Sequence, residues 1–210
     1  MDGEIDESWK PLFDQFEFPM DEIYEEGKEI YPPRNQVFRV FKEFEADGIN
    51  VVFIFQDPYH GKGQANGLAC SVNKDVPIPP TLRNIFKEIT SNFPERNYEF
   101  THGDLTKWVN QGIFLLNCSL TVEKGKPGSH IEYWSEFTDD VIKFISQKNK
   151  YAIFVLLGNF AKKKAEFIEN KKYIITSTHP SPYSANSGFL GSGIFRKIEY
   201  LFGDPIDWRN

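Results

Sequence analysis

Four short apolar runs, separated by segments with helical spacing, constrain the fold of this chain more than any other feature. The runs span residues 51–55, 112–117, 151–157 and 173–176 and are rich in β-branched and aromatic side chains. Runs of this length and composition are typical of buried strands. Because strands that alternate with helices form a parallel sheet with helices on both faces, we predict an α/β fold.

Apolar side chains recur at steps of three and four residues between these runs. This spacing predicts amphipathic helices over 37–44, 82–89 and 137–145, and a last helix over 193–202. A shorter, lysine-rich helix is predicted over 160–170, with its lysines on a solvated face. The sequence contains no internal repeat and no low-complexity tract.

Length and charge describe a single domain with an uneven charge distribution. A chain of 210 residues can bury a sizeable core, so we expect residues 1–210 to form one unit. The net charge of −6 by itself argues against a nucleic-acid partner. Residues 1–30, however, contain 11 acidic and 2 basic side chains, whereas the other 180 residues contain 19 acidic and 22 basic ones. The body is therefore mildly basic. We expect the acidic residues 1–8 to be flexible, either as a solvated segment or as a screen against non-specific DNA contact.

Cysteine usage and apolar patterning indicate the compartment. Cys70 and Cys118 lie in apolar segments and provide no disulfide framework, which favours a reducing environment. The 4 histidines and 2 cysteines show no paired metal-ligand spacing, so we expect no metal site. The apolar runs are far shorter than the roughly 20 residues of a membrane span, and the acidic start resembles no targeting signal. We expect a protein that is neither secreted nor bound to membranes, cytoplasmic in a prokaryote and nuclear in a eukaryote or virus.

Polar turns follow all four apolar runs. They contain Gln56–His60, Asn117, Gly158–Asn159 and His179–Ser184. Ligands of open parallel sheets bind beyond the carboxyl ends of the strands, so these turns should meet at one edge. There the Asp57 carboxylate can orient a water and stabilise positive charge, while the His179 imidazole can donate a hydrogen bond to a departing anion. Either residue alone is more often a turn cap, but their convergence with Asn117 favours hydrolysis through a cation-like transition state.

Further polar groups in these turns suit a nucleotide. Asn117 presents a donor beside an acceptor, which complements an imide face such as that of uracil and mismatches the amine of cytosine. An Asn at this position is also a common turn residue. The proline-rich turns 77–81 and 179–182 are stiff and expose hydroxyl and N–H groups that can hold phosphates, although each alone is ordinary loop chemistry. Lys124 and Lys126 are further candidates for contact with a DNA backbone.

Five ordered motifs in the chain resemble those of family 1 uracil-DNA glycosylases. In chain order they are residues 30–33, 56–61 with 63–65 and 67–69, 115–117 with 120–122, 179–182 with 184–185 and 188–189, and 205–208. The second is similar to the family's water-activating loop, the third to its uracil-binding strand end, and the fourth to its DNA-intercalation loop. The resemblance extends from about Trp9 to Trp208 and thus covers nearly the whole chain.

The resemblance implies a single α/β domain with a central four-stranded parallel sheet flanked by helices on both faces. It implies hydrolysis, without cofactor or metal, of the N-glycosidic bond between uracil and deoxyribose. The reaction leaves an abasic site and initiates base-excision repair. Such enzymes flip the base out of the stack into a pocket. The expected partners are uracil-containing DNA, single- or double-stranded, and protein inhibitors of the family; the expected state is a monomer.

The resemblance also implies roles for individual residues. Asp57 would position the water, and His179 would bind uracil O2 as the base leaves. The other residues expected to bind the substrate are Gln56, Tyr59, Cys70 and Asn117, with Pro58 and His60 supporting the loop. The expected DNA contacts are Pro80, Thr81, Gly158, Asn159, Ser181, Pro182, Tyr183 and Ser184. The Tyr59 ring would exclude thymine, and the Asn117 amide would select uracil over cytosine.

Four positions depart from the family's usual residues. Cys70 stands where the family has a Phe that stacks on uracil, and that loss could slow excision by roughly ten- to a hundredfold. Phe55 replaces a Gly, Tyr183 a Leu, and Asn159 a Ser. None of these changes removes a proton-handling group, so they bear on rate and DNA contact. The alternatives to an active uracil-DNA glycosylase are a weakened module that binds uracil or abasic DNA, an enzyme for a modified pyrimidine, and an acidic DNA mimic.

Overall fold

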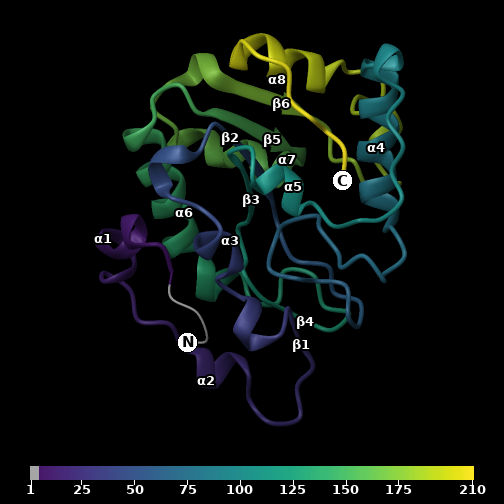
Figure 1. The fold of residues 1–210 in the computed structure, drawn as a ribbon. Coiled ribbons are helices and arrows are strands. Elements are labelled where there is room, and N and C mark those ends of the chain that lie inside the picture. Colours follow the sequence, from purple (N-terminus) through teal and green to yellow (C-terminus); the bar gives the residue numbers. More distant parts are fainter. Residues whose placement is uncertain (1–4) are drawn as a thin grey trace.

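A four-stranded parallel sheet forms the centre of the molecule, seen in the computed structural model, which describes residues 5–210 (Figure 1). Its strands lie in the order β3-β2-β5-β6. They are β2 (Val51–Phe55), β3 (Ile113–Asn117), β5 (Ile153–Leu157) and β6 (Ile174–Ser177). All four correspond to the apolar runs of the sequence, and the predicted α/β fold is confirmed. Two further short strands, β1 (Ile30–Tyr31) and β4 (Val122–Glu123), pair antiparallel beside the main sheet.

The strand order creates a switch point between β2 and β5. The chain passes from β2 to β3 on one side of it and then returns to place β5 on the other side. Val51 of β2 is in register with Ile113 of β3 and with Ile153 of β5, so the three carboxyl ends lie close together. Sheets wound in opposite directions from such a point leave a crevice between the two strand ends. The fold therefore provides a binding position beyond Phe55 and Leu157.

Eight α-helices and several 3-10 turns connect the strands of the described chain. The helices are α1 (Lys10–Phe13), α2 (Met20–Ile23), α3 (Arg39–Lys42), α4 (Pro80–Asn92), α5 (Thr106–Val109), α6 (Ile131–Lys148), α7 (Gly158–Lys163) and α8 (Ile194–Phe202). The 3-10 turns are Glu7–Trp9, Arg34–Gln36, Ala46–Gly48, Pro94–Arg96, Lys164–Phe167, Lys171–Tyr173 and Ala185–Ser187. Figure 1 shows α1, α3 and α6 on one side of the sheet and α4 and α8 on the other.

Two of the predicted helices are shorter than expected. The segment 37–44 is helical only over α3, because Phe38 and Phe41 pack their rings among those of other segments rather than along one long helix. In the lysine-rich segment 160–170, the α-helix α7 ends at Lys163, and a 3-10 turn follows over Lys164–Phe167. Its lysines do not all face solvent, because the Lys164 ammonium is buried against the Asp139 carboxylate.

Aromatic side chains fill a separate core on each face of the sheet. On one face Phe114 of β3 packs against Trp9 and Phe41, with ring centroids 5.4 and 5.6 Å apart. On the other face Phe53 of β2 lies near Phe195 of α8, at 6.3 Å. Helical layers cover both faces of these parallel strands, so every side chain along them is buried. The strand sequences are therefore continuously apolar instead of alternating.

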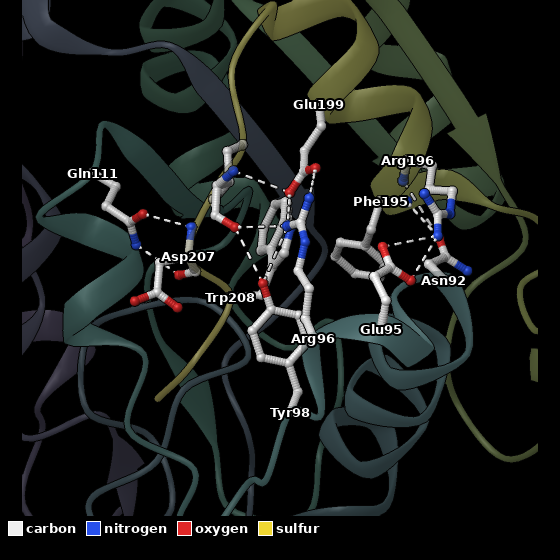
Figure 2. Close-up of polar contacts among 11 residues, drawn as sticks. Asn92, Glu95, Arg96, Tyr98, Gln111, Phe195, Arg196, Glu199, Asp207 and Trp208 are labelled. Carbon is white, nitrogen blue, oxygen red and sulfur yellow. Dashed lines mark hydrogen bonds and ion pairs between the residues drawn. The ribbon is translucent and has the colours of Figure 1, made fainter.

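The C-terminal segment is locked onto the second of these cores (Figure 2). The Arg96 guanidinium donates to both carboxylate oxygens of Glu199, at 2.6 Å each. Oε1 of Glu199 also accepts from the Trp208 indole N–H and from the Ile206 backbone N–H, both at 3.0 Å. Trp208 is fully buried. The 205–208 motif therefore has a structural role.

The acidic N-terminus is attached to the body from residue 6 onward. The Asp6 backbone N–H donates to the Phe41 carbonyl at 3.1 Å, and the Ala46 N–H donates to the Ser8 hydroxyl at 2.8 Å. Residues 1–4 of the segment 1–8, which is expected to be flexible, lie outside the described chain. Among residues 5–210, no helix combines the length and apolarity needed to cross a membrane.

Candidate active site

A cavity of about 480 Å³ opens at the carboxyl ends of β2 and β5, where the strand order predicts a crevice. Its lining consists of Phe55, Gln56, Asp57, Pro58, Tyr59, His60, Cys70, Thr81, Pro127, Leu157, Gly158, Asn159, Phe160, His179 and Ser181. The turns that follow β2, β5 and β6 therefore meet as the sequence predicted. Pro58 helps to end β2, because its ring fixes φ and it has no N–H for a strand ladder.

The Asp57 carboxylate has one oxygen held by the protein and one oxygen free. Oδ2 accepts hydrogen bonds from the Gln56 side-chain amide at 2.7 Å and from the Gly128 backbone N–H at 3.0 Å. Oδ1 is buried and has no hydrogen-bond partner among the described residues. Burial raises the pKa of Asp57, and the two hydrogen bonds partly oppose that rise. The arrangement leaves Oδ1 as an acceptor for a water or a ligand in the cavity.

The His179 imidazole is arranged as a neutral donor. Its Nδ1 accepts the Ser181 backbone N–H at 3.0 Å, so this nitrogen carries no proton and the proton lies on Nε2. Burial lowers the pKa of the ring, which keeps it uncharged at neutral pH. Gly158 provides the space for it, since a Cβ there would come within 3.0 Å of the His179 Cβ. The Phe55 ring meets the imidazole edge-on at 6.1 Å.

Tyr59 and Cys70 form one wall of the cavity. The Tyr59 hydroxyl lies 3.3 Å from the Cys70 Sγ and donates to the Cys70 carbonyl at 3.4 Å. Burial raises the pKa of the Cys70 thiol to about 12, so it is protonated at neutral pH and is no nucleophile. Cys70 also has a φ of 62°, a left-handed conformation that few residues with a side chain adopt. Cys70 therefore acts as a small, neutral contact for the Tyr59 ring.

Asn117 ends β3 beside the cavity without lining it. It is in register with Phe55, which does line the cavity, and it is 7% exposed. Its Oδ1 and the Asp57 Oδ1 are the two buried side-chain polar atoms without a partner in the described part of the chain. Buried polar atoms nearly always have partners in folded proteins, so an unpaired one marks a place for a ligand or water.

The residues expected to contact DNA divide into two groups. Thr81, Asn159 and Ser181 lie in the cavity wall together with Gly158, whereas Pro80, Pro182, Tyr183 and Ser184 lie outside it. The Ser184 hydroxyl donates to the His179 carbonyl at 2.8 Å and thus shapes its own loop. Tyr183, in the same loop, is 99% exposed.

Four residues of the cavity lining were not among the expected site residues, and neither was Gly128. These four are Phe55, Pro127, Leu157 and Phe160. Gly128, with a φ of +79°, directs its N–H at Asp57 from 71 positions along the chain. The sequence predicted a DNA contact for Lys124 and Lys126 in the same loop but no role for Gly128, because a backbone donor has no side-chain pattern. Among residues 5–210, no group of three or more His, Cys, Asp or Glu side chains is arranged to hold a metal.

Comparisons with known proteins agree with this geometry. A model of the Uracil DNA glycosylase superfamily matches residues 41–199. The uracil-DNA glycosylase of Borrelia duttonii (strain Ly) is 47% identical over 214 residues, which cover 96% of this chain and 95% of that protein. The crystal structure of mimivirus uracil-DNA glycosylase matches with a TM-score of 0.86 and 28% identity over 97% of this chain and 86% of its own. A variant of the mimivirus protein in complex with UGI matches with a TM-score of 0.86 and 28% identity over 97% of this chain and 88% of its own. With a cavity at the sheet's switch point, a carboxylate and a neutral imidazole facing it, and relatives matched over nearly its whole length, the chain belongs to the uracil-DNA glycosylase superfamily.

Proposed function

We propose that this chain is a monofunctional uracil-DNA glycosylase of family 1, which removes uracil from DNA and leaves an abasic site. The observation that carries the proposal is the pairing of an unsatisfied Asp57 oxygen with a neutral His179 in one cavity. Hydrolysis of an N-glycosidic bond needs stabilisation of a cationic sugar and of an anionic base, and these two groups supply one each. Their position in a cavity suits a base that has left the helix stack.

The chemical step follows from the two groups. As the bond between the sugar C1′ and uracil N1 breaks, the electron pair stays on the base, and the His179 Nε2–H donates to the oxygen that gains charge. The Asp57 carboxylate stabilises the positive sugar and accepts a hydrogen bond from water at its free Oδ1. Water oxygen then bonds to C1′ and releases its proton toward that carboxylate. No charge on His179 is needed, which agrees with its burial and with the hydrogen bond that its Nδ1 accepts from the Ser181 N–H.

Selectivity for uracil is assigned to Asn117 and Tyr59. The unpaired Oδ1 of Asn117 is available to an N–H donor such as uracil N3–H, and the neighbouring amide N–H₂ suits an acceptor such as O4. Tyr59 is anchored at its hydroxyl by Cys70, so its ring forms a fixed wall. We propose that this wall leaves no room for the methyl group of thymine.

The DNA contact is assigned to the rim. Thr81, Asn159 and Ser181 offer donors to phosphates next to the flipped nucleotide, and the exposed Tyr183 ring fills the gap left in the stack. Because the mimivirus variant that matches this chain was crystallised with UGI, we propose that an inhibitor of this kind also binds here. The bacterial sources of similar proteins support action in the cytoplasm.

A second function, a module that binds uracil-containing DNA but excises slowly, is favoured by one observation. Cys70 places a small thiol, rather than an aromatic ring, in the wall of the cavity. Without a ring at that position the flipped base would lose stacking worth roughly 1–3 kcal/mol. The lack of a ring at position 70 would lower both the affinity for the flipped base and the rate at which the base is released from the sugar.

The deciding experiment is excision from a labelled oligonucleotide with one uracil, in EDTA, followed by alkaline cleavage of abasic sites. We expect the wild-type chain to cut this substrate and to leave the thymine-containing control intact. Asp57→Asn should lower the rate by about 10²–10⁴-fold, and His179→Ala by about 10²–10³-fold. No cutting by the folded wild-type chain, with cutting restored by Cys70→Phe, would instead establish the binding module.

A further inference from the structure

The peptide unit between Pro180 and Ser181 is held from two sides. Its carbonyl oxygen accepts a hydrogen bond from the Asn84 side-chain amide of α4 at 2.8 Å. Its N–H belongs to Ser181 and donates to the His179 Nδ1 at 3.0 Å. A peptide unit is planar, so a donor that fixes the direction of the carbonyl also fixes the direction of the N–H. Asn84 and His179 are therefore joined by a chain of two hydrogen bonds through one rigid amide.

We propose that Asn84 is a positioning residue for His179, because it holds the Pro180–Ser181 amide that determines which imidazole nitrogen carries the proton. This inference rests on the proposed function for its effect on excision. Asn84 does not line the cavity, and its side-chain amide donates to the Pro180 carbonyl. It acts through the backbone, and hydrogen bonds in such a chain strengthen one another by polarisation.

The protonation pattern of His179 depends on that amide. With the Ser181 N–H on Nδ1, the imidazole keeps its proton on Nε2, where it can donate to the departing base. If the amide turns away, Nδ1 is free to take a proton. The ring then either loses the Nε2 donor, as the other tautomer, or becomes charged. Both outcomes remove a neutral donor from the cavity.

The hydrogen bond found on the His179 ring within residues 5–210 is the one from the Ser181 N–H. Phe55 of β2 and Gly158 of α7 lie near the ring, and neither is charged. Two titratable groups of the loop after β2, Asp57 and His60, line the same cavity. Burial is the cause that lowers the pKa of His179.

Asn84 is the first of three polar residues on one face of α4. Asn84, Glu88 and Asn92 follow at intervals of four, which places them in a row along the helix. All three hold backbone atoms of residues 180–196, the segment that runs from the His179 loop into α8. The Asn92 Oδ1 accepts the N–H groups of Phe195 and Arg196 at 3.1 and 3.4 Å (Figure 2).

Asn92 therefore provides a matched control for Asn84. It is the same residue type, on the same helix, and it holds the same segment, but it contacts the start of α8 instead of the amide beside His179. A general loosening of the segment should affect both variants. A change confined to Asn84→Ala must act through the Pro180–Ser181 amide.

The experiment compares Asn84→Ala and Asn92→Ala in the full chain by imidazole ¹⁵N NMR and by uracil excision. We expect Asn84→Ala to increase the fraction of His179 protonated on Nδ1, to raise its pKa, and to lower kcat by about five- to tenfold with little change in KM. Asn92→Ala should leave the ¹⁵N shifts of His179 as in the wild type. If Asn84→Ala does not fold, Asn84→Asp keeps the shape and, when ionised, offers no donor.

Two results would overturn the inference. One is an unchanged His179 tautomer and pKa in the Asn84 variants, and the other is an equal change in Asn92→Ala. The NMR measurement needs no substrate, so it remains decisive if the wild-type chain does not excise uracil. An absence of excision by the wild-type chain would contradict the proposed function but not the role of Asn84.

Discussion

The Asp57 carboxyl group serves the fold with one oxygen and the cavity with the other. Oδ2 accepts hydrogen bonds from Gln56 and Gly128, whereas Oδ1 has no partner among the described residues. Burial raises the pKa of Asp57 more than the two hydrogen bonds lower it. Ionisation of Asp57, which the proposed chemistry requires, is therefore less favourable in the folded protein than in the unfolded chain, a conflict common at functional sites.

Asp57→Asn should stabilise the chain at neutral pH while it slows excision strongly. The folded pKa of Asp57 lies above its unfolded value of 3.8. The group therefore contributes stability only when protonated, and that contribution is lost as the pH rises through the folded pKa. We expect Tm at pH 7 to rise by roughly 2–4 °C, the change that about 1 kcal/mol produces in a chain of this size.

The measurement is thermal unfolding of the two proteins in a series of buffers from pH 7 down to pH 4. The advantage of Asp57→Asn should shrink as the pH falls, because the wild-type carboxyl becomes protonated. A variant that is less stable than the wild type at pH 7 would show that the Oδ2 hydrogen bonds outweigh burial.

At this scale the sequence predicts side chains well and backbone groups poorly. Asp57 and His179 stand directly after apolar runs, so their meeting at one sheet edge follows from the topology alone. Asn84 contacts the Pro180 carbonyl, and Gly128 donates its N–H to Asp57, from 96 and 71 positions away along the chain. Neither contact has a local pattern, because it depends on how distant segments are packed.

Among the elements, α4 links the rim of the cavity to the start of α8. Its first turn carries Thr81, which lines the cavity, and its last turn carries Asn92, which holds the start of α8. Between them Glu88 is fully buried. Its carboxylate accepts the N–H groups of Gly191 and Gly193 at 2.6 and 2.9 Å. The helix thus fixes the return of the chain from the His179 loop into α8.

Glu88→Gln should lower the free energy of unfolding by about 2–4 kcal/mol, because one acceptor oxygen becomes an N–H₂ that faces backbone donors. The amides of Gly191 and Gly193 cannot both be satisfied by a single carbonyl oxygen in that position. Urea denaturation measures the effect, with Glu136→Gln on the exposed face of α6 as the control. Equal urea midpoints for the two variants would contradict this role for Glu88.

Element boundaries were predicted where packing agrees with local preference. The four strands and α8 lie close to their expected positions, because each is a short apolar run or a clear amphipathic pattern. The prediction of a helix over 37–44 was too long. Aromatic residues have modest helix propensity, and the ring of Phe38 packs against rings of distant segments. The solvated face predicted for the lysine-rich segment was wrong at Lys164. Its burial against Asp139 depends on a contact with a distant helix, which the local sequence does not indicate.

For the molecule as a whole, the sheet separates two aromatic cores, and the C-terminal segment closes one of them. Trp208 packs its ring against Phe195 and Trp108, with centroids 4.9 and 5.1 Å apart. Its backbone carbonyl accepts the Trp108 indole N–H at 3.0 Å. The last residues of the chain therefore belong to the core of the domain, although they lie far in sequence from the strands that they cover.

Trp208→Ala should destabilise the whole domain without acting on the cavity chemistry. Truncating a buried Trp typically costs about 3–5 kcal/mol, from lost burial and the cavity left behind. Here the loss also leaves the Glu199 Oε1 without its indole donor, while Arg96 and the Ile206 N–H still hold that oxygen. Trp208→Phe keeps a ring in the core and should therefore lower the free energy of unfolding less than Trp208→Ala.

Urea denaturation should show the wild type as the most stable protein, Trp208→Phe as the next and Trp208→Ala as the least stable. Excision rates measured well below the melting range should remain near the wild-type value, because Trp208 does not line the cavity. A large loss of excision in a folded Trp208→Phe protein would show instead that the C-terminal segment controls the geometry of the site from the far core.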